Sequence, residues 1–134
     1  MTHIPITLFT AAVLGILCVV LSFRVSLERT RTKVLLGDGA GDPNTARLQR
    51  CIRAQGNFVE YVPLALILLA GVEVSGASRL TCEIYSILLI VARIAHPIGI
   101  GQPRPNVARA AGAMLTWLVI LGLSIEALLL LPRA

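Results

Sequence analysis

Four long apolar segments divide this chain, and they decide what it can fold into. They cover about residues 4–27, 47–72, 80–98 and 107–131. Each holds roughly 20 residues or slightly more, the length that a helix needs to cross a hydrocarbon core about 30 Å thick. Because lipid offers no partner to an unpaired backbone group, each segment must be helical. The sequence therefore predicts a single all-α domain over residues 1–134, an integral membrane bundle of four transmembrane helices.

The composition agrees with this class. Apolar residues make up 56% of the 134 residues and charged residues only 14%, whereas a soluble domain would need more polar surface. The net charge is +5, but the basic residues are interleaved with the apolar segments, so membrane topology explains them better than nucleic acid does. Cys18, Cys51 and Cys82 lie far apart, without metal-ligand spacing, so neither a disulfide framework nor a metal site is predicted.

The basic residues also predict the orientation. Ten of the 12 lie in or beside the first and third connections: Arg24, Arg29, Arg31, Lys33, Arg47, Arg50, Arg53, Arg93, Arg104 and Arg109. The other two are Arg79 and Arg133. The positive-inside rule places the arginine-rich connections in the cytoplasm and both termini in the periplasm.

The connections carry turn and capping signals. Asp42 and Pro43 predict an N-cap followed by proline at the first helical position. The segment GIGQPRPN, residues 99–106, predicts a turn that follows Pro97, with Asn106 capping the fourth helix.

Charged side chains near the span ends are predicted to be solvated at the membrane surface. Arg29, Arg31 and Lys33 are expected to contact lipid headgroups. The carboxylates of Glu73, Glu83 and Glu126 are expected to be solvated at the opposite interface, near Arg79 or Arg133.

A polar stripe runs along the start of the second segment. At about 100° per residue, one sector roughly 100° wide contains Arg50, Arg53, Asn57, Glu60 and Tyr61. Glu60 lies about 15 Å from Arg50 along the axis, well inside the apolar layer. An ionised carboxylate there costs several kcal/mol unless it is paired or hydrated, so we expect Arg53 and Asn57 to be its partners. The stripe is predicted to face protein or a wet cavity.

The other three helices are predicted to bring polar groups to the same membrane level. Arg93 and His96 are three residues apart and share one face, Arg109 lies in the first turn of the fourth helix, and Arg24 closes the first. The second and fourth helices also direct their positive N-terminal ends there. This excess of positive charge predicts a site for an anionic ligand. His96 has no metal-binding partner at a suitable spacing and is expected to form hydrogen bonds.

The helix-two pattern RxxRAxxNxxEYxP resembles the MAPEG superfamily, the membrane-associated proteins in eicosanoid and glutathione metabolism. The residues that match are Arg50, Arg53, Ala54, Asn57, Glu60, Tyr61 and Pro63. The loop GDGAGDP before the pattern is similar to that of small bacterial members. The resemblance implies a homotrimer in the bacterial inner membrane, with glutathione bound between neighbouring subunits near the cytoplasmic face.

The resemblance also implies a chemistry, in which glutathione is the cosubstrate of a transferase or peroxidase-like enzyme. Its thiolate would attack a lipophilic electrophile that arrives from the bilayer. The implied glutathione-binding residues are Arg50, Arg53, Asn57, Glu60, Tyr61, Arg93 and His96. Arg109 and Arg24 are similar to catalytic arginines of the family, whose fixed positive charge would lower the pKa of the thiol.

Two positions depart from the family, and other functions stay open. Ile100 stands where many active members have a tyrosine, and Gly56 replaces an arginine of some synthases. A non-enzymatic lipid-binding or scaffold protein of the same fold is one alternative. A small multidrug transporter with Glu60 as its proton-coupling carboxylate is another, although the surrounding arginines do not suit a cation. Two structural alternatives are also open. Arg50 and Arg53 would be headgroup anchors, or Arg53, Asn57 and Glu60 would form a purely structural network that holds the trimer together.

Overall fold

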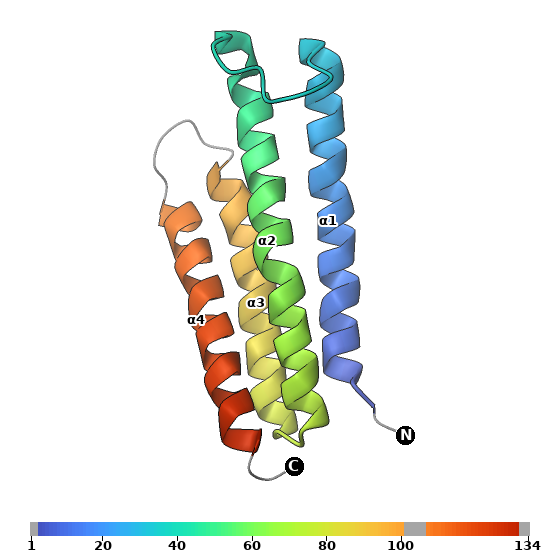
Figure 1. The fold of residues 1–134 in the computed structure, drawn as a ribbon, viewed down its shortest axis with the longest axis vertical. Coiled ribbons are helices and arrows are strands. Elements are labelled where there is room, and N and C mark those ends of the chain that lie inside the picture. The colour runs from blue at the N-terminus through green and yellow to red at the C-terminus, as the bar shows by residue number, and fades with distance from the viewer. Residues whose placement is uncertain (1–2, 101–106, 132–134) are drawn as a thin grey trace.

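The chain forms a bundle of four antiparallel helices (Figure 1). A computed structural model describes residues 3–100 and 107–131. The elements are α1 (Pro5–Thr32), the 3-10 turn η1 (Pro43–Thr45), α2 (Ala46–Val74), α3 (Arg79–Ile100) and α4 (Val107–Leu130). All four α-helices are long and apolar enough to cross a membrane. The predicted four-helix membrane bundle is therefore confirmed.

The core of the bundle is a continuous apolar cluster in which α2 is central. Leu14 of α1, Leu69 of α2, Leu89 of α3 and Leu123 of α4 are all buried in it. Large apolar side chains also stay exposed on every helix, for example Phe23, Ile67, Ile87 and Trp117. Apolar residues both inside and outside are what a helix bundle surrounded by lipid requires.

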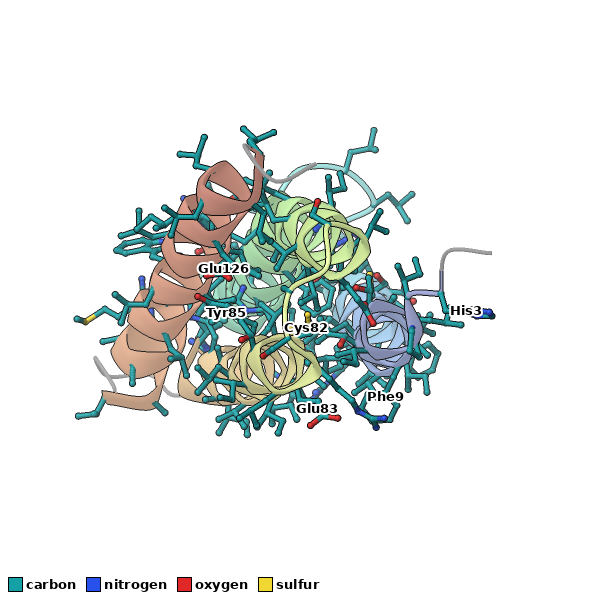
Figure 2. The ribbon with its side chains drawn as sticks, turned by 90° about the horizontal axis from the view of Figure 1, so that it is seen from below. His3, Phe9, Cys82, Glu83, Tyr85 and Glu126 are labelled. Atoms are coloured by element: carbon teal, nitrogen blue, oxygen red, sulfur yellow. The ribbon has the colours of Figure 1, made fainter. Side chains whose placement is uncertain are left out.

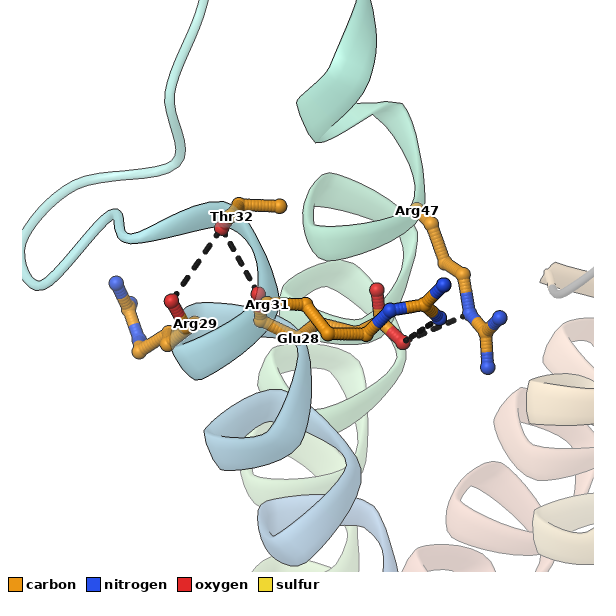
Figure 3. A network of polar contacts seen from close by, with 5 residues as sticks. All are labelled: Glu28, Arg29, Arg31, Thr32 and Arg47. Carbon is orange, nitrogen blue, oxygen red and sulfur yellow. Dashed lines mark hydrogen bonds and ion pairs between the residues drawn. The ribbon is translucent and has the colours of Figure 1, made fainter.

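The first helix is longer than the apolar segment predicts, since it continues from residue 27 to Thr32. Glu28 in this last turn is buried, with its Oε1 2.9 Å from Nε of Arg47 and 3.6 Å from Nη1 of Arg31 (Figure 3). This ion pair joins α1 to α2. Arg29 does not simply reach for headgroups, because its Nη1 donates to the carbonyls of the loop that follows α1, at Val34, Leu35 and Gly37.

The cap predicted before the second helix is present. Asp42 accepts a hydrogen bond from the backbone N–H of Asn44, at 2.8 Å, and η1 leads directly into α2. The third helix runs through Pro97 to Ile100, two residues beyond the predicted span. Proline removes only one helical hydrogen bond, so a final turn is preserved beyond it. The predicted turn over residues 101–106, with Asn106 as a cap, lies outside the described residues.

At the opposite end of the bundle, seen in Figure 2, the prediction of a solvated carboxylate is wrong for one glutamate. Glu73, at the end of α2, is not a solvated interfacial carboxylate. It accepts hydrogen bonds from the backbone N–H groups of Ile6 and Thr7, at 3.0 and 2.8 Å, and from the hydroxyl of Thr7, at 2.6 Å. The carboxylate therefore caps the first turn of α1, where backbone donors are free and the dipole is positive. Glu83 does pair with Arg79, at 2.7 Å, on the exposed side of α3.

Candidate functional site

The largest of the cavities lies at the end of the bundle where α1 and α3 end and α2 and α4 begin. Its volume is about 1070 Å³. Six of the predicted site residues line it: Arg50, Arg53, Asn57, Glu60, His96 and Arg109. Asp38 of the first loop and Ile100 of α3 complete the polar and apolar parts of the wall. We call this space the larger cavity. Most of the helix-two stripe thus faces a polar cavity, as the sequence predicts.

The charges around the larger cavity are arranged differently from the prediction. Within the described residues, Glu60 makes no hydrogen bond or ion pair, and it is exposed, as is Arg53. Asn57 does not bind Glu60 either, because its side-chain oxygen accepts from Arg93. The cavity therefore presents an uncommitted carboxylate together with the guanidinium groups of Arg50 and Arg109. Such a wall suits a ligand that carries both signs of charge.

Arg93 lies beneath the cavity wall and is not among the residues that line the cavity. Its side chain is only 1% exposed, and Nη1 donates to Oδ1 of Asn57 at 3.0 Å. Its Nη2 donates to the Thr116 hydroxyl and, at 3.3 Å, to the Gly112 carbonyl. Arg93 thus connects α3 to both α2 and α4. The structure gives it a positioning role toward Asn57 rather than direct access to a ligand.

His96 also joins two helices. It is buried, and its Nδ1 lies 3.0 Å from the backbone carbonyl of Arg109. Because a carbonyl only accepts, Nδ1 must carry the proton. In the neutral ring Nε2 is then an acceptor, and it is buried with no hydrogen-bond partner in the described part of the chain. The predicted hydrogen-bonding histidine is present, and it joins α3 to α4 beside the larger cavity.

Two glycines allow α3 and α4 to approach closely around this site. A Cβ added at Gly112 would lie 2.8 Å from the carbonyl oxygen of Ala92 and 2.8 Å from the backbone nitrogen of His96. A Cβ at Gly99 would collide with the backbone of Arg109. Small residues at such contacts bring transmembrane helix backbones together. The position of Arg109 relative to His96 depends on this contact.

A second cavity, which we call the smaller cavity, lies between α1, α2 and α3 and has a volume of about 320 Å³. Its lining is Leu21, Arg24, Arg47, Arg50, Cys51, Ala54, Pro97 and Ile100. Arg50 and Ile100 line both cavities, so the two spaces are neighbours. Arg24 lines only the smaller cavity, and Arg109 lines only the larger one. The two predicted catalytic arginines therefore lie in different cavities of one chain.

Tyr61, the remaining residue of the stripe, is half-buried and lines neither cavity. Its contact with glutathione, like the catalytic role of Arg24, stays a prediction. Among the described residues, no three histidine, cysteine, aspartate or glutamate side chains come close enough to hold a metal ion. The site is built from guanidinium, carboxylate, amide and imidazole groups.

Comparison with known proteins agrees with a membrane helix bundle. Residues 7–129 match the MAPEG family. The chain belongs to the MAPEG family. It is also similar to the inner membrane protein YecN of Escherichia coli K12, with 31% identity over 111 residues that cover 83% of this chain and 84% of that protein. The protein of the same name from Escherichia coli O6:H1, strain CFT073, is similar to the same extent. The family that the helix-two pattern suggested for this MAPEG protein is therefore confirmed by the match.

Proposed function

We propose that this MAPEG protein is a membrane-bound, glutathione-dependent transferase that conjugates the glutathione thiolate to lipophilic electrophiles. The observation that carries the proposal is the larger cavity. It collects Arg50, Arg53, Asn57 and Glu60 from α2, His96 from α3 and Arg109 from α4. The family resemblance assigns the first five to glutathione binding and Arg109 to catalysis, and three of the four helices supply them.

The charges of the tripeptide match the wall of the larger cavity. Glutathione carries two carboxylates, one ammonium group and one thiol at neutral pH. Glu60 would pair with the ammonium group, and Arg53 and Arg50 would meet the carboxylates through charge-assisted hydrogen bonds. Since Oδ1 of Asn57 is engaged by Arg93, the amide N–H groups of Asn57 are left to donate to the peptide. A volume of about 1070 Å³ leaves space for a second reactant beside it.

The proposed reaction uses fixed positive charge to supply a nucleophile. A free thiol is mostly protonated at neutral pH, since its pKa is about 8.5, and the thiolate is the reactive form. The Arg109 guanidinium cannot remove a proton but lowers the pKa of a thiol beside it. Nε2 of His96 would accept the thiol hydrogen. The thiolate then forms a carbon–sulfur bond with the acceptor while the leaving group departs with its electron pair.

The proposal includes assembly as a homotrimer and a membrane orientation. Arg53 and Glu60 are exposed in one chain although they belong to the site, so a neighbouring copy would cover them. The arginine-rich end would face the cytoplasm, and both termini would face the periplasm. The membrane would be the inner membrane, because the similar protein YecN is named an inner membrane protein.

One observation favours a second candidate function, a lipid-binding or scaffold protein without enzyme activity. Ile100 lines both cavities, and its side chain has no hydroxyl to donate to a thiolate where many active family members have a tyrosine. On this alternative the same cavities would hold lipid, and the polar stripe would serve assembly.

A paired experiment separates the two functions. The purified protein in detergent is titrated with glutathione by calorimetry, and conjugation to a chloronitrobenzene acceptor is followed against a blank without protein. Saturable binding with conjugation above the blank is the expected result. Native mass spectrometry of the same sample identifies bound lipid. Tight lipid without glutathione binding or conjugation would overturn the transferase proposal in favour of the lipid-binding alternative.

A further inference from the structure

Three arginines line the smaller cavity: Arg24 of α1, with Arg47 and Arg50 of α2. No aspartate or glutamate is among the described residues of its wall. Arg24 and Arg47 line only the smaller cavity, whereas Arg50 also lines the larger one, so the two cavities share one arginine. Glu28 pairs with Arg47, whereas Arg24 and Arg50 have no acidic partner among the described residues. The cavity therefore keeps an excess of positive charge, which favours an anion.

The donors of two of these arginines are available for such an anion. Nε of Arg50 is buried and has no hydrogen-bond partner within the described residues. A buried donor without an acceptor is costly, so a ligand oxygen that reaches Arg50, which lines both cavities, would be stabilising. Arg47 uses its Nε for the ion pair with Glu28 (Figure 3), which leaves its terminal nitrogens as donors.

Glu28 holds Arg47 at this position. The carboxylate is 7% exposed, while the side chain of Arg47 is 59% exposed and would otherwise be free to extend into water. Because Glu28 contacts Nε from the α1 side, the guanidinium is fixed between the two helices. The carboxylate is thus a positioning group for a cation of the smaller cavity and is not itself part of the wall.

The apolar part of the wall indicates what is attached to the anion. Leu21, Ala54, Pro97 and Ile100 form it, on three different helices. The volume of about 320 Å³ is enough for a compact charged group with a few attached carbons. Guanidinium groups bind phosphate with paired hydrogen bonds, and the cytoplasmic ends of membrane helices lie at the depth of lipid phosphates.

We infer that the smaller cavity is a phosphate-binding site beside the proposed glutathione site, and that the two sites share Arg50. Arg24, Arg47 and Arg50 bind the phosphate oxygens, and Leu21 and Ile100 contact the carbon atoms next to them. The phosphate belongs either to the headgroup of an anionic phospholipid or to a soluble phosphate ester or ion. The binding chemistry is the same in both cases.

Native mass spectrometry of the full chain in an uncharged detergent tests this site. Dioleoyl phosphatidylglycerol is titrated in, with dioleoyl phosphatidylcholine as the zwitterionic comparison. The wild type is expected to retain the anionic lipid at about tenfold lower concentration than the zwitterionic one. Arg24→Gln and Arg47→Gln should each weaken that retention about tenfold, the effect of one charge-assisted hydrogen-bonding group.

Arg31→Gln is the matched control. Arg31 also contacts Glu28, at 3.6 Å, but does not line the smaller cavity, so phosphatidylglycerol retention should stay within about twofold of the wild type. Circular dichroism during heating verifies that each variant is folded. Equal retention of phosphatidylglycerol by the wild type, Arg24→Gln and Arg47→Gln would exclude a lipid headgroup as the ligand of these arginines.

Cys51 provides a readout that does not depend on substitution. It lines the smaller cavity, whereas Cys82 is buried near the other end of the bundle (Figure 2). Bound phosphatidylglycerol should slow alkylation of Cys51 by N-ethylmaleimide severalfold and leave Cys82 unaffected. An unchanged Cys51 rate at saturating lipid would exclude a lipid headgroup from this cavity.

Inorganic phosphate distinguishes the two sources of the ligand. If millimolar phosphate protects Cys51 and displaces the lipid, the site takes soluble phosphate. If only phosphatidylglycerol protects Cys51, the site takes a lipid headgroup. Both results support a phosphate site, whereas protection by neither probe refutes it. Glutathione binding is measured in parallel, and because Arg47 is absent from the larger cavity, Arg47→Gln should leave it unchanged.

Discussion

Arg93 of α3 donates a hydrogen bond from Nη1 to Oδ1 of Asn57 on α2, over a distance of 3.0 Å. This contact orients a residue of the larger cavity through a guanidinium that the cavity does not expose. Because Oδ1 is engaged, the NH2 group of the Asn57 amide is the part that is left for a ligand. A ligand in the cavity therefore meets a hydrogen-bond donor at Asn57, whose orientation depends on the packing of α3.

Substitutions at Asn57 should separate stability from ligand binding. Asn57→Leu removes one of the three acceptors of a buried guanidinium and is expected to lower the free energy of unfolding by about 1–3 kcal/mol, because Nη1 of Arg93 is left without its acceptor. Asn57→Asp keeps an acceptor for Arg93 and should be folded, but it should bind glutathione at least tenfold more weakly, since the N–H donors are lost. Unfolding in detergent and calorimetry measure the two effects.

Gln55→Leu is the control for these variants. Gln55 is a half-buried amide on the same helix, and it lines neither cavity. Its replacement should change neither the free energy of unfolding nor the glutathione affinity by much. An Asn57→Asp protein that binds glutathione as well as the wild type would show that the amide is no part of the ligand site.

Glu60→Gln should weaken glutathione binding by roughly tenfold to a hundredfold, because the proposed partner of the ligand ammonium group loses its charge. The fold should be unaffected, since Glu60 is exposed and forms no ion pair among the described residues. Glu83→Gln, at the other end of the bundle, is the matched control and should bind glutathione like the wild type. Calorimetry that gives the same affinity for both variants would exclude Glu60 from the site.

Arg109→Ala should reduce turnover, on the order of 100-fold, with little loss of glutathione affinity. The guanidinium is proposed to stabilise the thiolate, while the contact to His96 comes from the Arg109 backbone and survives the substitution. The ultraviolet absorbance of bound thiolate, measured with and without Arg109, checks this step directly. Unchanged turnover and thiolate absorbance would remove Arg109 from the catalytic role.

Gly112→Ala should destabilise the bundle by about 1–3 kcal/mol, because the added carbon would press on the backbones of Ala92 and His96. Gly15→Ala is the opposite case. No atom outside its own helix lies within 4 Å of a Cβ at Gly15, so helix propensity alone predicts a gain of about 0.5–1 kcal/mol. Thermal unfolding of both variants tests the close packing of α3 on α4, and similar midpoints would contradict it.

The spans and the helix-two stripe could be predicted from sequence because both depend on local patterns. Apolar length determines a membrane-crossing helix, and the helical repeat places Arg50 and Glu60 on one side. The partners of the polar groups depend instead on which helices meet. Asn57 was predicted to serve Glu60, yet Arg93 reaches it from 36 residues further along the chain.

The partners of Glu28 and Glu73 could not be predicted for the same reason, since they too depend on which helices meet. Nothing in the local sequence distinguishes Glu28 or Glu73 from a solvated carboxylate at a membrane surface. Each is instead satisfied by another helix, Glu28 by Arg47 and Glu73 by the first turn of α1. A carboxylate one turn from the end of an apolar span, facing the same side as its core residues, is the signal that could have indicated such a contact.

The two glutamates hold α1 against α2 at both ends, with Glu28 and Arg47 at one end and Glu73 and Thr7 at the other. These two attachment points fix the axial register of the pair, since sliding α1 by even one residue would break both. When the protein enters a bilayer of different thickness, the first two helices must tilt together as one rigid hairpin.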